Sequence, residues 1–486
     1  MQTLNRDIIT HTNDHPLKIM QFGGGNFLRA FVDWMVDVLN AKTDFNGGIA
    51  VIKPTEGGDY SELKAQEGLF TVILDGIKNG ETVEEKTLVT SVQEVVNSYT
   101  EWDTYLKLAE NPDLRFIVSN TTEAGIQFNP DDSFEDTPPR QFPAKLTRWL
   151  YHRFHHFKGE ASKGCVLLPC ELVENNGMAL KQAVLRYADH WGLAKDFKRW
   201  IDDANSFCST LVDRIVSGYP TARADELEKE LGYKDDLLVA GEYYHSWVVQ
   251  ASVSVQKELP FSQTNLNVEF VDDLVPYREM KVRVLNGAHT ALVPVGYLAG
   301  IRLVNKVMED EMFSSFVESL LLEEVAPTLD FPQKIKQKFV ADVLDRFRNP
   351  LLQHQLISIS LNSSSKFSAR LLPTLKDYLA SEGNLPERIV FGLSALIRFY
   401  KGEADGNPIP LKDDPKILSF FASKWKKYDS DFLTLEDLSK SILCNTFIWN
   451  EDLTEIDGLA EKVAQNLGRI QSKGIRPALS DVLNKC

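Results

Sequence analysis

The sequence predicts an α/β protein in which a Rossmann-type dinucleotide-binding domain with an extended sheet precedes a mainly α-helical domain. Three observations predict this. The strand-like segment Leu17–Phe22 runs directly into a glycine turn and then into a helical pattern. Buried strand candidates recur through the first half of the chain, whereas helical periodicity dominates the second half. We place the domain boundary near Val275, which gives residues 1–275 and 276–486.

The glycine turn is the first candidate for ligand binding. Apolar residues recur at helical spacing directly after it, so glycines between a strand and a helix could let a pyrophosphate approach the positive helix end. The G-x-G-x-x-G fingerprint is partial, because Leu28 takes the place of its third glycine. A glycine turn without a ligand is the alternative. The residues predicted to hold the cofactor here are Phe22, Gly23, Gly24, Gly25, Asn26 and Phe27.

The next segments extend the predicted sheet. Gly48–Lys53 reads as a second strand, but it ends without the acidic residue that would bind both ribose hydroxyls. No arginine cluster for a 2′-phosphate follows either, so the preference between the two nicotinamide cofactors stays open. Asn79-Gly80 is a strong hairpin signal within residues 70–96, which predicts an antiparallel insertion or an extension of the sheet.

Two later strand candidates end in polar residues. Residues 114–119 run into Thr121 and Glu123, and ligands of open α/β sheets bind beyond the carboxyl ends of strands. We therefore expect Thr121 and Glu123 to line the cofactor cleft, although turn chemistry explains them equally well. Residues 164–169 form another predicted strand, after which Asn176 precedes Gly177 and a predicted helix over residues 178–191.

The second domain is predicted from helical periodicity. The predicted helices cover residues 281–298, 308–324, 335–347, 389–400, 417–425 and 459–473.

Lys281, Asn286 and His289 fall on one face of the first of these helices. At about 100° per residue, Lys281 and His289 lie ~80° apart and Asn286 falls within the same ~140° arc. A lysine whose pKa is lowered by burial can exchange a proton with a hydroxyl, an asparagine can donate to a developing oxyanion, and a histidine can hold a second hydroxyl. This set favours carbonyl reduction or alcohol oxidation. The alternative is a snorkelling cation, a helix-terminal amide and a core histidine.

Composition excludes several kinds of partner. The net charge of −16 over 486 residues repels phosphate backbones, so we expect no nucleic-acid partner. No apolar run is long enough to span a bilayer and the N-terminus lacks the hydrophobic segment of a signal peptide, so a cytoplasmic protein without membrane contact is expected. Nothing in the sequence marks an oligomer, so a monomer or weak oligomer is expected.

We expect no metal site. The five cysteines are scattered, and the Cys165-x4-Cys170 pair has no second pair at a zinc-ligand spacing. His152, His155 and His156 are more typical of a solvated helix face.

Five motifs together resemble the polyol-specific long-chain dehydrogenase/reductase family, which includes the mannitol dehydrogenases, over almost the whole chain. They are Gly23-Gly-Gly-Asn-Phe27-Leu-Arg29-Ala30, Thr121-Thr-Glu123-Ala-Gly125, Cys170-Glu171 with Asn176-Gly177, Val212-Asp-Arg-Ile215 and Lys281-x4-Asn286-x2-His289. The resemblance implies a metal-independent, NAD-linked (NADH) exchange between D-altronate and D-tagaturonate in hexuronate breakdown.

The resemblance also assigns roles by motif. Lys281 resembles the general acid/base, Asn286 and Asn176 resemble the pair that polarises the reacting oxygen, and His289, Asp213 and Lys366 resemble substrate contacts. The chain departs from the mannitol-type pattern at two places. Ile357-Ser358-Ile359 replaces a segment that carries an arginine, so details of polyol binding do not carry over. Leu172 replaces an asparagine, so the assignment of Asn176 rests on a weaker match than that of Asn286. The cation for a substrate carboxylate stays open among Arg29, Arg283, Arg348 and Lys366.

Two alternatives remain. One is the same chemistry on fructuronate and mannonate, or on fructose and mannitol. The other is a non-catalytic NAD-binding sensor.

Overall fold

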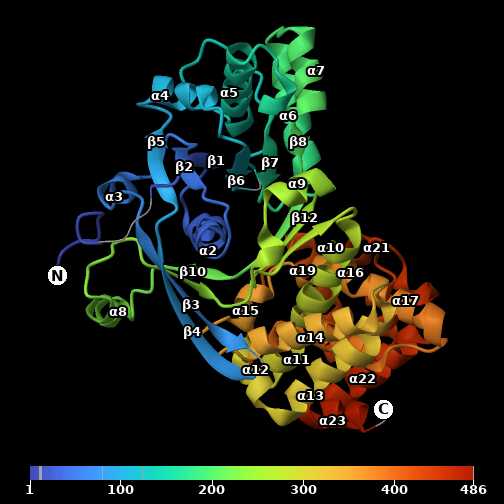
Figure 1. Ribbon diagram of the computed structural model, residues 1–486. Helices are drawn as coiled ribbons and strands as arrows, with labels where there is room; N and C mark the ends of the chain where they lie inside the picture. Colours follow the sequence, from blue (N-terminus) through green and yellow to red (C-terminus); the bar gives the residue numbers. More distant parts are fainter. Residues whose placement is uncertain (10–13, 79, 123, 405, 485–486) are drawn as a thin grey trace. The chain divides into compact units, whose positions relative to one another are not determined.

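A computed structural model of the chain describes residues 1–9, 14–78, 80–122, 124–404 and 406–484. The chain forms two compact units. Unit 1 comprises Met1–Asp75 and Thr82–Leu274, and unit 2 comprises Gly76–Glu81 and Val275–Cys486. In Figure 1 most of unit 1 is coloured from blue to yellow-green and most of unit 2 from yellow to red.

A six-stranded parallel sheet forms the centre of unit 1. Its order is β5-β2-β1-β6-β7-β8, and every neighbouring pair is parallel. This is the Rossmann order, and it reverses between β1 and β6, where such sheets bind dinucleotides. The predicted Rossmann-type fold is confirmed. The strands are β1 (Leu17–Phe22), β2 (Gly48–Lys53), β5 (Val92–Asn97), β6 (Phe116–Ser119), β7 (Val166–Pro169) and β8 (Ser206–Phe207).

Side chains alternate between the two faces of this sheet, as the strand period of two requires. Ile49 and Val51 of β2 pack in the core that contains the helix α2 (Trp34–Lys42). Ala50 and Ile52 pack in the opposite core, with residues of the other helices labelled above the sheet in Figure 1. Those helices are α4 (Trp102–Lys107), α5 (Phe142–His156), α6 (Asn176–His190) and α7 (Lys195–Ala204).

The predicted insertion has a sheet of its own. Strands β3 (Phe70–Lys78) and β4 (Glu81–Val89) join β10 (Val216–Gly218) and β11 (Val239–Glu242) in the order β10-β11-β3-β4. They do not extend the parallel sheet. A third sheet, β13-β12-β9, contains Val268–Val271, Ser246–Gln250 and Thr210–Asp213. The remaining helices of unit 1 are α1 (Asn26–Leu28), α3 (Ser61–Ala65), α8 (Ala224–Leu231) and α9 (Val253–Glu258).

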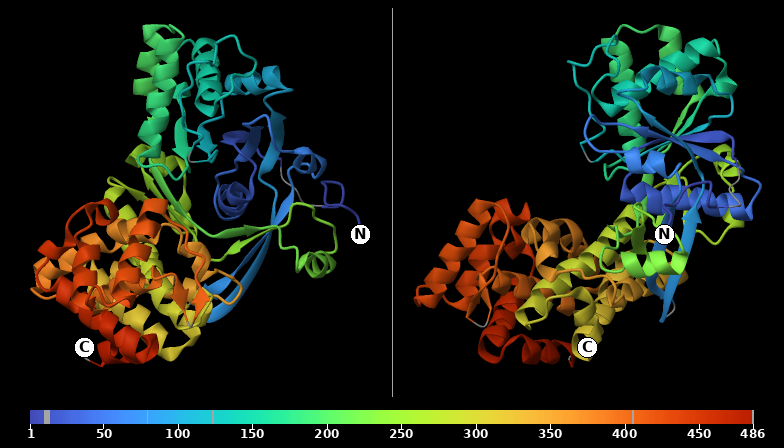
Figure 2. Two further views of the ribbon diagram at one scale, coloured as in Figure 1. Left: turned by 180° about the vertical axis from the view of Figure 1, so that it is seen from behind. Right: turned by 90° about the vertical axis from the view of Figure 1, so that its left-hand side faces the viewer.

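Helices make up nearly all of unit 2 in both views of Figure 2. The first predicted helix begins earlier than expected, as α10 (Val275–Met280), and continues through a π-helical segment, η5 (Lys281–Asn286), into α11 (Gly287–Leu298). The other α-helices are α12 (Val304–Glu309), α13 (Glu311–Ser319), α14 (Gln333–Arg348), α15 (Leu356–Ile359), α16 (Ser363–Arg370), α17 (Leu372–Glu382), α18 (Glu387–Phe399), α19 (Pro415–Asp429), α20 (Leu435–Leu443), α21 (Thr446–Trp449), α22 (Leu459–Lys473) and α23 (Ile475–Leu483).

The helix predicted over residues 308–324 is interrupted at Asp310. The Asp310 carboxylate accepts a hydrogen bond from the backbone N–H of Met312, and this cap starts α13 as a new helix. Another π-helical segment of unit 2, η6 (Leu320–Val325), follows α13. In the described chain no helix is long and apolar enough to cross a membrane.

Helix α11 lies at the centre of the unit 2 core and packs against α18. A Cβ at Gly392 of α18 would lie 3.4 Å from the Cβ of Ala291, so the glycine lets the two helices approach closely. This packing fixes the helix that carries His289.

Candidate functional site

The glycine turn after β1 has the backbone that its sequence predicts. Gly23 has φ +113°, and a Cβ there would lie 3.2 Å from the carbonyl oxygen of Asn120 and 3.3 Å from Cδ1 of Leu28. A glycine is therefore required at this position. Leu28 replaces the third fingerprint glycine without blocking the turn, because its side chain packs in the core beneath Gly23.

The residues after Gly23 leave a cradle that fits a pyrophosphate. Gly25 and Asn26 are exposed, and among the described atoms none lies within 4 Å of a Cβ built on Gly25. The helix that starts at Asn26 lacks a side-chain cap within the described chain, so its first amides point at this open space. Gly24 is tied down, since its N–H donates to the Tyr60 hydroxyl at 2.6 Å. Phe22 is buried, and Phe27 stacks on Phe31.

A buried carboxyl group supports the turn from below. Asp33 is fully buried at the end of a π-helical segment, η1 (Arg29–Asp33), and burial raises its pKa to about 8. The Gln21 amide lies near enough to lower this pKa, and its Nε2 donates to the Gly23 carbonyl at 3.0 Å. Gln21 therefore holds the Gly23 carbonyl, while among the described residues neither carboxyl oxygen of the buried Asp33 has a hydrogen-bond partner.

The loops after β6 and β7 are fastened to each other at the carboxyl edge of the sheet. Buried Glu171 accepts hydrogen bonds from the hydroxyl of Ser119 and from both the N–H and the hydroxyl of Thr121, each at 3.0 Å. The Asn120 amide donates to the Cys170 carbonyl at 2.8 Å. Thr121 thus lies beside the reversal point of the sheet, where the sequence placed it. Glu123 lies outside the described residues.

Asn176 is buried at the start of α6, and its amide is fully engaged with backbone groups. Its Nδ2 donates to the carbonyls of Pro169, Glu171 and Thr210 at 2.9–3.1 Å, and its Oδ1 accepts from the N–H of Thr210 at 2.8 Å. The amide therefore ties the ends of β7 and β9 to α6. Its predicted role in polarising a substrate oxygen stays a prediction, and this geometry favours a structural role.

Asp213 is half-buried at the end of β9. Arg214 is buried, donates to the carbonyls of Ala30, Tyr243 and Tyr244, and lies over the Trp34 ring. Arg214 therefore stabilises the interior of unit 1.

Lys281 and Asn286 lie at the two ends of η5. The i→i+5 hydrogen bonding of a π-helix brings residues five apart into register, so Lys281 and Asn286 share one side of this segment more closely than the α-helix of the prediction allows. Both residues are half-buried. In the described chain the Asn286 side-chain amide makes no hydrogen bond, so it can donate to a ligand.

His289 lies one turn further along the same helix and is buried. Burial lowers its pKa well below the ordinary value, and the nearby charges of His354, Arg346, Arg370 and Lys366 lower it further. The imidazole is therefore neutral at neutral pH. Its Nε2 is buried without a hydrogen-bond partner among the described residues, which makes it available to a substrate hydroxyl. Its ring packs 4.3 Å from the Phe347 ring, centroid to centroid.

Three of the four candidate cations for a carboxylate have structural partners. Arg29 binds Asn26 and the Leu237 carbonyl, Arg283 pairs with Asp377 at 2.5 Å, and Arg348 pairs with Glu318. Lys366, on α16, donates to the Ile359 carbonyl at 2.8 Å and lies near His289. Arg370, which the sequence analysis did not single out, lies one turn from Lys366.

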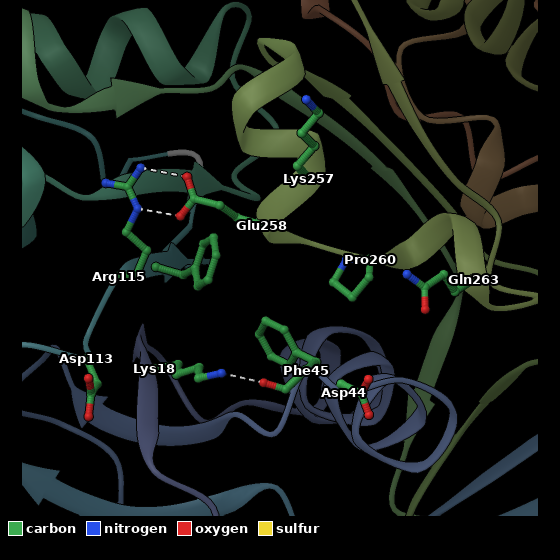
Figure 3. A pocket seen from close by; sticks show the side chains of 10 residues that line it. Lys18, Asp44, Phe45, Asp113, Arg115, Lys257, Glu258, Pro260 and Gln263 are labelled. Atoms are coloured by element: carbon green, nitrogen blue, oxygen red, sulfur yellow. Dashed lines mark hydrogen bonds and ion pairs between the residues drawn. The ribbon is translucent and has the colours of Figure 1, made fainter.

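A cavity of about 400 Å³ in unit 1 lies beside the amino ends of strands β1 and β6, opposite the end where the glycine turn lies. Figure 3 shows Arg115 paired with Glu258 on its wall, and Lys18 bonded to the Phe45 carbonyl. Lys18 is near the start of β1, whereas Gly23 follows its end, so this cavity is separate from the nucleotide cradle. Among the described residues, no group of three histidine, cysteine or acidic side chains could hold a metal.

Comparison with known families decides the classification. Residues 17–263 match the mannitol dehydrogenase Rossmann domain and residues 273–471 match the mannitol dehydrogenase C-terminal domain. The chain belongs to the mannitol dehydrogenase family. It is an oxidoreductase, as its relatives' names indicate, and the family resemblance of its motifs is confirmed.

The chain matches its relatives over nearly their full length. This chain is 49% identical over 481 residues to an altronate oxidoreductase of Yersinia enterocolitica, with 99% of each chain covered. Altronate oxidoreductases of Pectobacterium carotovorum and Escherichia coli are 47% and 46% identical, again over 99% of each chain. The fold is that of mannitol 2-dehydrogenase from Pseudomonas fluorescens, solved with NAD and D-mannitol (22% identity, TM-score 0.67, 100% of both chains), and of a D-sorbitol dehydrogenase (22%, 0.79, 99% of this chain and 100% of the other).

Proposed function

We propose that this chain interconverts D-tagaturonate and D-altronate by NAD(H)-dependent hydride transfer. The observation that carries the proposal is its identity of nearly one half, over the full length, to relatives named altronate oxidoreductase. The Rossmann strand order and the open cradle after Gly23 support NAD as the cofactor, held by the turn residues from Phe22 to Phe27 and by Thr121. Glu123 belongs to the same proposal by its motif.

NADH, when bound, supplies the hydride for reduction of the keto carbon. Asn286, whose amide has no other partner in the described chain, donates to the oxygen on which charge develops. Lys281, on the same side of η5, gives that oxygen its proton and takes it back in the oxidative direction. The neutral His289 holds a neighbouring hydroxyl through its Nε2. Asp213 and Lys366 act as further substrate contacts by their motifs. Asn176 belongs to the same proposal by its motif, as the second donor to the reacting oxygen.

The test is NADH oxidation by the purified protein with D-tagaturonate, D-fructuronate and D-fructose. Wild type is expected to prefer D-tagaturonate, and EDTA is expected to leave the rate unchanged. Lys281→Ala should lower kcat by about 10²–10⁴-fold, the range for general acid/base catalysis. Lys306→Ala, which removes an exposed lysine of α12, is the control. A preference for another ketose would mean that D-tagaturonate is not the substrate. A Lys281→Ala variant with normal kcat would mean that Lys281 is not the general acid/base.

A further inference from the structure

Basic side chains gather around His289 inside unit 2. Arg346, Arg370 and Lys366 lie close enough for their charges to act on the imidazole. The His354 ring lies 5.2 Å from it, centroid to centroid, and burial lowers the pKa of His354. Lys366 and Arg370 are four residues apart on α16, so they face the same side of that helix, and α16 packs against η5 and α11. The substrate groups proposed above therefore lie beside a concentrated positive charge.

Arg370 contacts the segment that carries those groups. Its Nη1 lies 3.2 Å from the Thr290 hydroxyl oxygen and 3.5 Å from the carbonyl oxygen of Asn286. The guanidinium is half-buried, and within the described chain no carboxylate lies within ion-pair distance of it. Arg370 differs in this respect from Arg283 and Arg348, which are paired with Asp377 and Glu318, respectively.

Two cations placed this way repel each other. After burial, the Arg370 charge is the largest cause that lowers the Lys366 pKa, while the Asp413 carboxylate opposes the shift. Asp413 is itself bound by the hydroxyls of Ser364 and Tyr400. Like charges one helical turn apart cost stability, and an anion that bridges them would offset this cost. A guanidinium is well suited to the task, because its planar N–H groups match the two oxygens of a carboxylate.

We propose that Arg370, assisted by Lys366, binds the substrate carboxylate and makes the enzyme select sugar acids over neutral ketoses. This inference rests on the proposed function. The Arg370 Nη1 lies 3.5 Å from the backbone carbonyl oxygen of Asn286. In D-tagaturonate four C–C bonds of about 1.5 Å separate the keto carbon from the carboxylate carbon, which spans roughly 5 Å. Arg370 is therefore within reach of the carboxylate of a substrate whose keto group lies at Asn286.

The experiment compares each acid with the neutral ketose that has CH₂OH in place of the carboxylate: D-tagaturonate with D-tagatose, and D-fructuronate with D-fructose. Arg370→Gln should lower kcat/KM for the acid by about 10²-fold, mainly by raising KM. The same substitution should change kcat/KM for the neutral ketose by less than about threefold. Arg370→Lys keeps the charge but loses the paired N–H groups, so it should fall between wild type and Arg370→Gln. Arg348→Gln removes an equal charge from an arginine that is paired with Glu318 and should leave the ratio of acid to neutral activity unchanged.

The outcomes separate this inference from the proposed substrate. If wild type prefers D-fructuronate, the proposed substrate is wrong, and the acid-to-neutral ratio in Arg370→Gln still decides the role of Arg370. If Arg370→Gln lowers kcat/KM equally for acids and neutral ketoses, or for neither, the inference is overturned. It is also overturned if wild type reduces neutral ketoses better than both acids.

Discussion

Asn176 and Asn286 are the same residue type in opposite circumstances. The sequence predicted both as donors to the reacting oxygen, because both stand in motifs of the family. In the structure, Asn176 uses its amide hydrogens on three backbone carbonyls, whereas Asn286 makes no side-chain hydrogen bond in the described chain. A motif cannot separate these cases, since it does not show which side chains the fold surrounds with backbone acceptors; Thr210, which both donates to and accepts from the Asn176 amide, is 34 residues away.

This contrast makes a paired prediction. Asn286→Ala should lower kcat by about 10²–10³-fold without changing the melting temperature, because it removes only a donor to the oxyanion. Asn176→Ala should cost about 2–4 kcal/mol of stability, because it leaves buried backbone groups without partners. Thermal unfolding and steady-state kinetics of both variants check this. A stable Asn176→Ala variant with a similarly reduced kcat would restore Asn176 to the polarising pair.

Asp33 predicts a dependence of stability on pH. Its pKa is about 8 in the folded chain against an ordinary 3.8, so between about pH 4 and pH 8 the unfolded chain has lost a proton that the folded chain keeps. The contribution of Asp33 to stability therefore falls by about 1.4 kcal/mol per pH unit over that window and is constant above it. Asp33→Asn keeps the shape without the titration. In denaturant unfolding at pH 5, 6.5 and 8, the variant should gain stability relative to wild type as the pH rises. A difference that does not vary with pH would mean that Asp33 is already ionised beside Arg29.

At the scale of elements, local signals predicted the parallel sheet well. Leu17–Phe22 and Gly48–Lys53 match their predicted bounds, because short, mainly apolar segments next to turn residues are typical of buried strands of a parallel sheet. The helix Leu459–Lys473 also matches, since a single amphipathic stripe defines it. The separate sheet of β3 and β4 could not be predicted, because its partners β10 and β11 lie far along the chain.

The π-helical segment η5 is the element that matters most for the site, and periodicity did not reveal it. An α-helical count puts Lys281 and Asn286 at the two edges of a broad arc, whereas i→i+5 bonding aligns them. Helix α16 was missed for a different reason: its Ser-rich first turn resembles a loop. The spacing of Lys366 and Arg370 by four residues is the signal that could have found its cationic face.

At the scale of the whole molecule, the proposed nucleotide cradle belongs to unit 1 and the residues proposed for proton transfer and carboxylate binding belong to unit 2. The sequence predicted the cradle and the proton-transfer residues, because each is encoded by a contiguous motif, but it did not single out Arg370, which lies on a separate helix. This division implies that cofactor binding and sugar-acid chemistry can be impaired separately by single substitutions in the full-length protein.

Gly23→Ala tests this division. A side chain there forces an unfavourable φ and a close approach to the Asn120 carbonyl, so strain of about 1–3 kcal/mol should weaken NADH binding by about tenfold or more. Lys281→Ala should bind NADH as wild type does and lose turnover instead. Fluorescence titration of NADH with both variants checks this, and Gly57→Ala is the matched control, because its Cβ would meet no described atom within 4 Å. Unchanged NADH affinity in Gly23→Ala would contradict the cradle, because the strained turn is the feature that lets the backbone approach a pyrophosphate.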